Sequence, residues 1–461
     1  MSLRVLYICH NHPDFHPGGT EIFAHDLFGA VKRRGAEAMF LACTDGVHRA
    51  EKPGTRLQGI GRTADEVVLW TGHFDRFYQS QIDLHGIVPE LTELLEAFRP
   101  DVVHFHHTLM IGVEALYLVK RVLPRAGIVL TLHDYFPICA NDGQMVMPSS
   151  GIGGKEPGDG HVLCRGASPD ACRRCFPQRS LDQFLLREQH VKTMFGLVDR
   201  FIAPSRFLRE RYIAWGIDAD KITLVANGRP AAAAAPHRAL PRAARRDAFG
   251  YFGNLSPYKG VKVMLAAAQR LAADGTPFAL RVHGGAPFQT EAFRAQIAEA
   301  AATTGGRVAM LGPYHRADVA RLVRDVDWVI VPSIWWENAP LVIQEAFQQR
   351  RPVLCSDIGG MAEMVRDGID GLHFRVADPG SLAGVMRRAA DEPKLWERLV
   401  AGMASPHGLE ECASEHLALY RHVLGREAIG APQRRETSRQ GARQGGRRII
   451  RIQGGDVAPA S

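Results

Sequence analysis

The sequence lacks any apolar run approaching the roughly 18 residues that a membrane-spanning helix requires, so no such span is expected. Its beginning, Met1 to Ile8, leads directly into a strand-like run and lacks the apolar core and cleavage site of a secretory signal. Short-period internal repeats are also missing, which argues against a repeat architecture. These absences favour a cytoplasmic protein built from ordinary globular domains.

The composition is that of a folded protein. The 461 residues are 46% apolar and 23% charged, values that are typical of globular domains. A chain of this length exceeds what one ordinary hydrophobic core supports, so we expect two domains with additional segments.

The net charge of +7 is concentrated near the end of the chain. Between Arg426 and Ser461, eight arginines stand against three acidic residues, and this surplus of five leaves only two positive charges for the rest of the protein. The segment is rich in Gly, Gln and Arg, which predicts a disordered, solvated tail. The alternative is a peripheral tether to anionic lipid at an inner membrane face, worth about 1 kcal/mol per basic residue. The charge distribution elsewhere predicts no nucleic-acid partner.

Strand-like and helix-like segments alternate along the chain. In the first half, short apolar runs predict strands at Arg4–Cys9, Asp101–Phe105, Ile128–Leu132 and Val198–Ala203. Between the first two, Thr20–Arg34 has the apolar spacing of an amphipathic helix. A second series of strands is expected at Ala248–Gly253, Phe278–Val282, Val308–Leu311, Val326–Val331 and Pro352–Ser356. Repeated units of this kind predict parallel sheets covered by helices on both faces.

A stretch rich in Ala, Pro and Arg, residues 230–246, separates the two series and predicts a linker. The fold class is therefore α/β, with two tandem doubly wound, Rossmann-like domains. The expected division is an N-terminal domain at 1–229 with a cysteine-rich insertion at 136–180, the linker, a C-terminal domain at 247–405, a helix at 406–425 that packs back, and the tail at 426–461. Ligands of such folds bind at the carboxyl ends of the strands, so a shared ligand would lie in the cleft between the domains.

The most informative local pattern follows the strand that ends near Ser333. We expect a helix over Leu341–Phe347, with Asn338 as its N-cap and Pro340 in its first turn. The free N–H groups at such a helix start are suited to a diphosphate.

Two glutamates belong to the same pattern. If the helix extends back to its expected cap, Glu337 and Glu345 lie about two turns, or roughly 10 Å, apart. Carboxylates so spaced could bracket a nucleotide sugar. An ordinary amphipathic helix with surface glutamates is the alternative interpretation of the spacing alone.

The segment resembles the E-x7-E-A signature of glycosyltransferase family 4, entered through Pro332-Ser333, with Glu337 and Glu345 as the two glutamates. Four further segments resemble motifs of that family in the same order: Phe252–Gly260, Leu311–Tyr314, Gly359–Val365 and Asp367–Gly371. The resemblance extends from residue 5 to residue 425. It implies the GT-B fold, with an acceptor-side N-terminal domain and a C-terminal domain that binds a nucleotide sugar.

Site residues follow from this resemblance. Lys259 is expected to neutralise the donor diphosphate as a point charge, and Glu345 to accept hydrogen bonds from the ribose. Glu337 and the segment Asn338, Ala339, Pro340 and Leu341 hold the sugar and phosphates, as the family segment implies, with the N–H groups supplied by its non-proline residues. The family usually has Arg where this chain has Asn254. Asn offers at most a neutral donor in place of a bidentate charged one, so this phosphate contact is expected to be weaker.

The N-terminal half supplies the opposite side of the expected site. Gly18 and Gly19 open a helix and resemble the family loop that faces the donor phosphates and the acceptor. His133 ends a buried strand and resembles the active-site histidine, which makes it a candidate catalytic residue together with Glu337 and Lys259. His104 and His106 share one face of a strand. They invite a metal hypothesis, but packing or cleft lining is the favoured interpretation because no carboxylate ligand is evident nearby.

Four of the eight cysteines lie in the insertion: Cys139, Cys164, Cys172 and Cys175. Cys172-x2-Cys175 has the spacing of a zinc knuckle, and the other two could complete a tetrahedral site. A structural zinc is preferred to disulfides in the cytoplasm, with reduced thiols as the alternative. No cofactor is expected for catalysis.

The resemblance implies a retaining hexosyltransferase that uses a UDP- or GDP-sugar. The acceptor would be a glycan or a lipid-linked molecule, in surface polysaccharide biosynthesis. The leaving diphosphate and the attacking hydroxyl share one face of the sugar, so no protein nucleophile is needed and orientation and charge stabilisation do the work. Two alternatives remain open from the sequence: a nucleotide-sugar epimerase of similar fold and a non-catalytic interaction protein.

Overall fold

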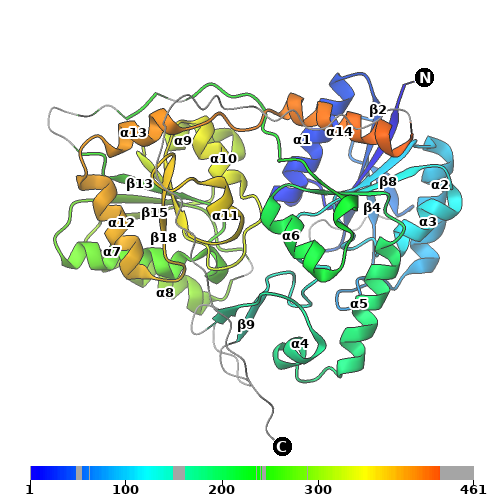
Figure 1. Ribbon diagram of the computed structural model, residues 1–461, viewed down its shortest axis with the longest axis horizontal. Coiled ribbons are helices and arrows are strands. Elements are labelled where there is room, and N and C mark those ends of the chain that lie inside the picture. Colours follow the sequence, from blue (N-terminus) through cyan, green and yellow to red (C-terminus); the bar gives the residue numbers. More distant parts are fainter. Residues whose placement is uncertain are drawn as a thin grey trace, which may run out of the picture.

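The computed structural model of the chain describes residues 2–47, 54–61, 63–148, 161–234, 236–238, 240, 245–287 and 289–425. The predicted basic tail lies outside these residues. Within them the chain forms two α/β lobes side by side, each around its own sheet (Figure 1). None of the helices in the described ranges combines the length and apolar character needed to cross a membrane.

The N-terminal lobe contains an eight-stranded sheet. Its spatial order is β12 (Ile222–Leu224), β11 (Arg200–Ala203), β8 (Gly127–Thr131), β7 (Val102–Phe105), β1 (Arg4–His10), β2 (Glu37–Thr44), β4 (Glu66–Trp70) and β3 (Leu57–Gly59). All neighbours pair in parallel except β3, which is antiparallel to β4. Alternate residues of β1 enter different apolar clusters, with Leu6 in one and Tyr7 in the other. Both faces of the sheet are therefore buried, as the uninterrupted apolar runs predict.

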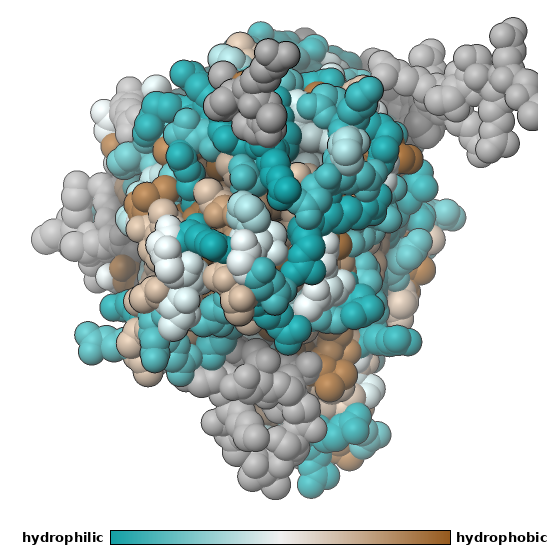
Figure 2. Space-filling model, turned by 90° about the vertical axis from the view of Figure 1, so that its left-hand side faces the viewer, coloured by the Kyte–Doolittle hydropathy of each residue, from teal (hydrophilic) through white to brown (hydrophobic). Residues whose placement is uncertain are grey.

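The C-terminal lobe contains a six-stranded parallel sheet. Its order is β15 (Val308–Gly312), β14 (Ala279–His283), β13 (Ala248–Phe252), β16 (Trp328–Val331), β17 (Val353–Ser356) and β18 (Gly371–Phe374). Each strand expected from the sequence in either lobe is present within two residues of its predicted bounds. Hydrophilic side chains cover most of the outer face of this lobe (Figure 2).

Helices cover both sheets. Those of the N-terminal lobe are α1 (Gly19–Arg33), α2 (Leu84–Phe98), α3 (Glu114–Val122), α4 (Pro169–Cys175), α5 (Leu181–Phe195) and α6 (Arg206–Trp215). Those of the C-terminal lobe are α7 (Val261–Ala273), α8 (Glu291–Ala302), α9 (Val319–Val323), α10 (Leu341–Gln348), α11 (Gly359–Met364), α12 (Pro379–Asp391) and α13 (Leu395–Gly402). Short elements complete the described parts: 3-10 turns η1 (Ala219–Lys221), η2 (Pro257–Lys259) and η3 (Arg316–Asp318), and the strand pairs β5 (Phe74–Asp75) with β6 (Ser80–Gln81) and β9 (Val146–Pro148) with β10 (His161–Leu163).

The last helix, α14 (Leu409–Val423), returns to the N-terminal lobe and packs beside α1 (Figure 1). The hydroxyl of Tyr420 on α14 lies 3.1 Å from that of Tyr7 and 2.6 Å from Nδ1 of His104, all three buried. Two chain crossings therefore connect the lobes. They run side by side in parallel, where the N–H of Arg229 donates to the carbonyl of His407 and the N–H of Leu409 donates to that of Arg229.

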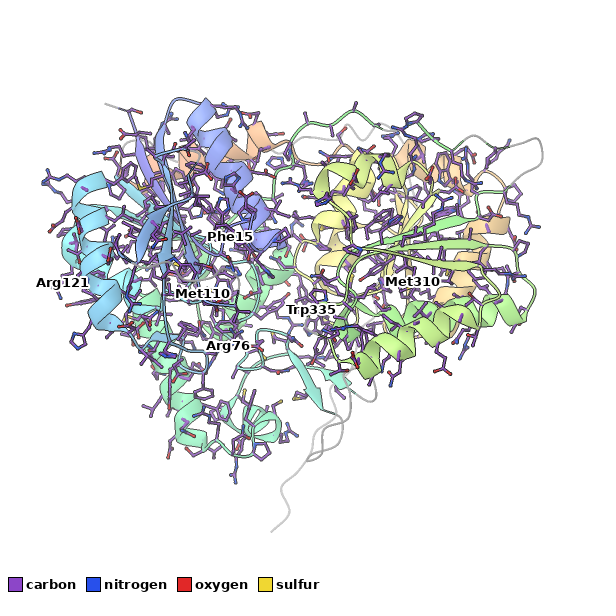
Figure 3. The ribbon with its side chains drawn as sticks, turned by 180° about the vertical axis from the view of Figure 1, so that it is seen from behind. Phe15, Arg76, Met110, Arg121, Met310 and Trp335 are labelled. Atoms are coloured by element: carbon purple, nitrogen blue, oxygen red, sulfur yellow. The ribbon has the colours of Figure 1, made fainter. Side chains whose placement is uncertain are left out.

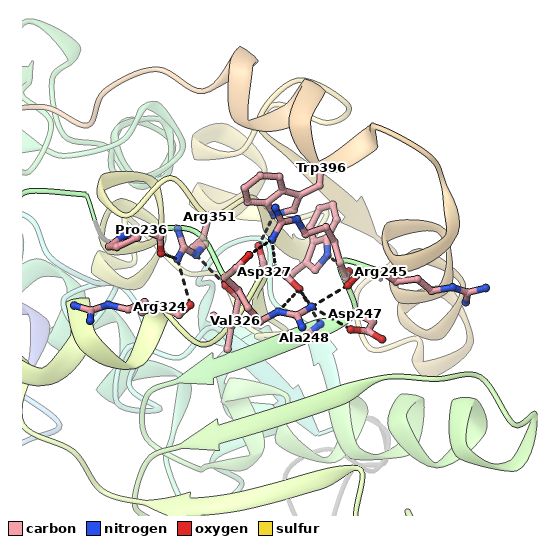
Figure 4. A network of polar contacts seen from close by, with 12 residues as sticks. Pro236, Arg245, Asp247, Ala248, Arg324, Val326, Asp327, Arg351 and Trp396 are labelled. Atoms are coloured by element: carbon pink, nitrogen blue, oxygen red, sulfur yellow. Dashed lines mark hydrogen bonds and ion pairs between the residues drawn. The ribbon is translucent and has the colours of Figure 1, made fainter. Parts of the chain in front are cut away.

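Residues of the linker are anchored to the C-terminal lobe through a buried carboxylate (Figure 4). Asp327 accepts hydrogen bonds from Arg238 and Arg246, and its backbone carbonyl accepts one from the indole N–H of Trp396. Because Asp327 is fully buried, these cations offset a charge that would otherwise be costly. The described part of 230–246 contains no helix or strand, yet it is held in place by these contacts.

Candidate functional site

A cleft of about 750 Å³ lies between the two lobes. It is lined from the N-terminal lobe by the start of α1 and the loop after β8, and from the C-terminal lobe by the loops after β13, β15 and β16. These loops follow the carboxyl ends of parallel strands, the edge at which doubly wound folds bind ligands. Trp335 lies between the lobes in Figure 3. All the non-cysteine site residues expected from the sequence line this cleft: Gly18, Gly19, His133, Asn254, Lys259, Glu337, Asn338, Ala339, Pro340, Leu341 and Glu345.

The start of α10 differs from the expectation. The helix begins at Leu341, its N-cap is Pro340 in an extended conformation, and no side chain caps it. The prediction that Asn338 is the N-cap is therefore wrong, because the backbone from 337 to 340 does not continue the helix. Glu345 is the fifth residue of α10 and lies about one turn inside it, rather than two turns from Glu337 along one axis.

Asn338 instead connects the two lobes. Its side-chain oxygen accepts a hydrogen bond from the hydroxyl of Ser205 at 2.6 Å, and its side-chain nitrogen donates to the backbone carbonyl of His133 at 3.1 Å. Ser205 also caps α6 by accepting from the N–H of Leu208. Within the C-terminal lobe, the backbone of Asn338 also packs directly against Gly360. A Cβ at Gly360 would lie 1.5 Å from the carbonyl oxygen of Asn338, so no side chain fits there.

Glu337 is paired with Lys259. Its Oε1 lies 2.6 Å from Nζ of Lys259 and also accepts from the hydroxyl of Ser333 and the indole N–H of Trp335. Burial raises the pKa of Glu337, but the Lys259 charge and these hydrogen bonds outweigh burial and lower it overall. Glu337 is therefore a carboxylate at neutral pH. The side chain of Lys259 is about one-third exposed and lines the cleft while its ammonium is bound to Glu337.

The loop that carries Lys259 depends on two close backbone contacts. Gly260 has φ of 70°, and a Cβ there would lie 1.7 Å from the carbonyl oxygen of Pro332. Gly284 has φ of 155°, and a Cβ there would meet the carbonyl oxygen of Gly253 at 1.8 Å. Only glycine fits such left-handed or crowded positions, so these residues bring the loops after β13, β14 and β16 together.

Glu345 forms an ion pair that the sequence did not indicate. Its Oε1 lies 2.6 Å from Nη2 of Arg229, and both side chains are largely buried. Burial raises the pKa of Glu345 above its usual value, although Arg229 and Arg316 oppose that rise. The other cation, Arg316, lines the cleft and forms a bidentate pair with Asp26 of α1.

The N-terminal ends of two helices lie close together at the cleft. Gly19 begins α1, and a Cβ placed on it would lie 3.8 Å from the side chain of Leu341, which begins α10. Gly18 precedes α1 and offers no side-chain cap, and Gly18, Gly19 and Thr20 line the cleft, so α1 begins at the cleft wall. Helix N-termini carry partial positive charge, and two of them together with Lys259 form an environment suited to a diphosphate.

Glu21 is the third residue of α1, within its first turn, and is almost fully buried. Burial raises the pKa of Glu21 to about 8; its own backbone N–H opposes the rise and Asp134 adds to it. The carboxyl group is thus mostly protonated at pH 7. A neutral Glu21 leaves the positive potential at this helix start intact, whereas an ionised one would oppose an anionic ligand.

His133 follows β8 and reaches the cleft from the N-terminal lobe. Burial lowers the pKa of His133 to about 3, with a further decrease from His107 and an opposing effect of Asp134. The ring is therefore neutral at pH 7, and its Nε2 lies 3.0 Å from Nδ1 of His106.

The neighbouring histidines form a buried cluster. The rings of His104 and His106 are 4.3 Å apart and fully buried. The carboxylate of Asp134 accepts from Nε2 of His107 at 3.1 Å, and although burial raises the pKa of Asp134, His107 and other contacts lower it to about 2. Full burial of His104 and His106 is what the packing interpretation predicts.

Four functional candidates were missed by sequence reasoning: Glu21, Arg229, Arg316 and Glu363. Glu363 of α11 accepts hydrogen bonds from the N–H groups of Arg206 and Phe207, and so caps α6 from the other lobe. Glu363 lies in the motif-like segment Gly359–Val365, from which no role for it was predicted, and the other three residues are lone charges without a local signal. Only contacts between segments more than a hundred residues apart identify them.

Comparisons with known proteins agree with this geometry. The family described as Glycosyltransferase Family 4 matches residues 17–233, and the one described as Glycosyl transferases group 1 matches residues 246–392. Together the two matches cover both lobes. The chain belongs to glycosyltransferase family 4.

Individual curated relatives match only part of the chain, at about 30% sequence identity. A D-inositol 3-phosphate glycosyltransferase from Nocardia farcinica is 32% identical over 200 residues, 41% of this chain and 44% of that protein. A glycogen synthase from Edwardsiella ictaluri is 30% identical over 194 residues, 39% of each. The chain thus spans about half the length, or less, of these curated relatives.

Solved structures of glycosyltransferases share the fold. HepE from Anabaena in complex with UDP has a TM-score of 0.59 at 17% identity, covering 92% of this chain and 98% of that one. The catalytic domain of starch synthase IV from Arabidopsis thaliana, bound to ADP and acarbose, has a TM-score of 0.63 at 16% identity, covering 92% of this chain and all of that one. The fold of this family 4 protein is therefore GT-B, with two Rossmann-like lobes.

Proposed function

We propose that this family 4 protein transfers a hexose from a nucleoside diphosphate sugar to an acceptor hydroxyl, with retention of the anomeric configuration. The observation that carries the proposal is the convergence in one cleft of Lys259, Glu337, Glu345 and His133 with the N-termini of α1 and α10. Each end of a nucleotide sugar finds a chemically matched group in this arrangement.

The diphosphate fits between the two helix starts, where backbone N–H groups and the ammonium of Lys259 would balance its charge. Glu345, held in place by Arg229, accepts hydrogen bonds from the ribose hydroxyls. Glu337 and the amides up to Leu341 hold the sugar ring. Arg316 offers a guanidinium in the same cleft and can compensate in part for Asn254, which occupies the position where the family usually has Arg.

In the reaction, the bond between the anomeric carbon and the phosphate oxygen breaks as a new bond forms to the acceptor oxygen on the same face of the sugar. The acceptor proton passes to the leaving phosphate oxygen, so the atoms balance without a protein nucleophile. The neutral ring of His133 lies beside this face. Because it carries no positive charge, it does not hold the anionic donor by an ion pair. The protein contributes orientation and stabilisation of the charge that develops on the leaving group.

The cationic and helix-start groups that line the cleft support a nucleoside diphosphate sugar as the donor class. UDP and GDP sugars both present a diphosphate and a ribose to these groups. The acceptor is a glycan or a lipid-linked molecule, and the pathway is surface polysaccharide biosynthesis. Trp335 lies within cation–π distance of Lys259 at the cleft wall and provides an apolar face for a sugar ring.

The proposal is tested with the full-length chain and a panel of nucleotide sugars, with hydrolysis and transfer followed by release of the nucleotide and the anomeric configuration read by NMR. Lys259→Ala and Glu345→Ala are expected to lose at least about 100-fold in kcat/KM, or roughly 2.7 kcal/mol, while keeping a native circular dichroism spectrum. Lys262→Ala, a lysine on α7 that does not line the cleft, is the matched control and should retain activity.

Three results would overturn the assignment. Full turnover in either cleft variant would remove the donor-site roles. Interconversion of nucleotide sugars without transfer would indicate an epimerase. Absence of both binding and turnover across the whole panel would indicate a non-catalytic interaction protein.

A further inference from the structure

The described part of the cysteine-rich insertion contains the antiparallel pair of β9 and β10 and the helix α4, and β9 and α4 lie below the two lobes in Figure 1. Cys139 precedes β9 and Cys164 directly follows β10, while α4 carries Cys172 and Cys175. The last two are three residues apart on one helix and so share a face. All four cysteines line one cavity of about 20 Å³, room for a single ion or water.

The four thiols form a donor set that suits a zinc ion better than other bound species. Four cysteines in which two follow the C-x2-C spacing are a donor set of structural tetrahedral zinc sites, with zinc–sulfur distances of about 2.3 Å. No three of the four sulfurs lie within 4.8 Å of one another in the structure, and Sγ of Cys164 donates to the carbonyl of Gly166. Binding would therefore bring the sulfurs closer together in the shared cavity, a movement for which rotation about χ1 between ordinary rotamers is a route.

Arg187 provides an independent observation. Its guanidinium is buried, and its hydrogen bonds go to the backbone carbonyls of Phe77, Phe136, Pro137 and Ile138, the last three directly preceding Cys139. Among the described residues, no carboxylate lies within ion-pair distance of Arg187. A buried cation without a counter-charge is costly, whereas a zinc ion held by four thiolates is a net anion next to it.

The same insertion contacts the C-terminal lobe at the donor site. The indole N–H of Trp336, the neighbour of Glu337, donates to the backbone carbonyl of Cys164 at 2.8 Å. Tyr258, the neighbour of Lys259, forms a side-chain hydrogen bond with Asn141. One cysteine is therefore in direct backbone contact with the loop that carries a candidate donor-binding carboxylate.

We propose that Cys139, Cys164, Cys172 and Cys175 bind one structural zinc ion, which fixes the insertion against the loops of Glu337 and Lys259. The described part of the insertion buries little apolar surface. The metal would supply the order that this segment needs to support closure of the two lobes. Its contribution to donor binding rests on the function proposed above, whereas the metal site itself does not.

Metal content is measured on the full-length protein, purified without chelator. The expected result is about one zinc per chain, with a first coordination shell of sulfur only by X-ray absorption. Growth with cobalt should give the visible spectrum of a tetrahedral cobalt thiolate. Cys172→Ser is expected to lose the zinc. Cys43→Ala, which changes a buried cysteine on β2 outside the insertion, should keep it.

Thiol titration of the unfolded protein separates the alternatives. Zinc predicts all eight cysteines as thiols once the metal is chelated. Fewer than eight without prior reduction would indicate disulfides and overturn the proposal, as would eight thiols without bound metal. These readouts need no sugar donor, so a wrong assignment of activity would leave them unchanged.

Discussion

The guanidinium of Arg229 and the carboxylate of Glu345 form a 2.6 Å ion pair between a chain crossing and the donor-site helix. Arg229 lies where the chain leaves the N-terminal lobe, and its backbone pairs with the second crossing at 407–409. The residue that we assign to the ribose is thus held by the segment about which the lobes would move. We therefore expect donor binding and the relative position of the lobes to be coupled through this pair.

Replacing Arg229 by Met should weaken both the folded structure and donor binding. Glu345 would remain buried without its nearest cation, its pKa would rise further, and a protonated carboxyl accepts hydrogen bonds less well. We expect a loss of about 3 kcal/mol in unfolding free energy and a rise in donor KM, measured by denaturation and steady-state kinetics. The double variant Arg229→Met/Glu345→Gln should recover much of the stability but not the donor affinity. Unchanged stability in the single variant would contradict the pair's role.

The pH dependence of stability should reflect Glu21. Its pKa is raised from 4.5 to about 8 in the folded protein, so the folded state binds more protons than the unfolded state between these values. The Glu21 contribution is therefore fully present below pH 4.5 and is lost as pH rises toward 8. Relative to Glu21→Gln, the wild-type protein should lose up to about 1.4 kcal/mol per pH unit in this window.

The measurement is chemical denaturation of both proteins at several pH values between 5 and 8. A constant difference between them would show that Glu21 is not protonated in the folded state. Above pH 8, ionisation of Glu21 should also weaken donor binding in the wild-type protein. The Gln variant should lack that decline.

Glu363 tests closure of the lobes. Its carboxylate caps α6 from the other lobe, and Glu363→Ala should free the N–H groups of Arg206 and Phe207. We expect donor KM to rise about fivefold, or roughly 1 kcal/mol, with little change in kcat. Glu397→Ala, an exposed glutamate in the first turn of α13 that does not line the cleft, is the control. An equal effect of both substitutions would point to a general loss of charge.

Trp336→Phe separates the metal site from its effect on the donor loop. The variant removes the indole donor to Cys164 and retains an aromatic ring against Phe207. Zinc content should stay at the wild-type level, while donor KM should rise several-fold, about 1 kcal/mol for one hydrogen bond. Wild-type kinetics would show that the insertion does not position the donor loop.

The sequence by itself determined the fold and much of the cleft lining. Apolar periodicity located the strands of both sheets, because each buried parallel strand must be apolar on both faces. The resemblance placed Lys259, Glu337 and Glu345 in one site, and all three line the cleft. The local pattern did not locate the start of α10. It favoured Asn338 as the N-cap, whereas the backbone is extended at Pro340 and the helix begins at Leu341.

Only the tertiary structure decided which groups surround these residues. Arg229 pairs with Glu345 across 116 positions, and Glu363 caps a helix more than 150 residues away. The charge states of Glu21 and His133 could not be predicted from the sequence either. Burial sets the pKa of both side chains, and burial is a property of the packed chain. Local pattern fixes which segments form strands and helices, whereas partners and protonation depend on how distant segments meet at the cleft.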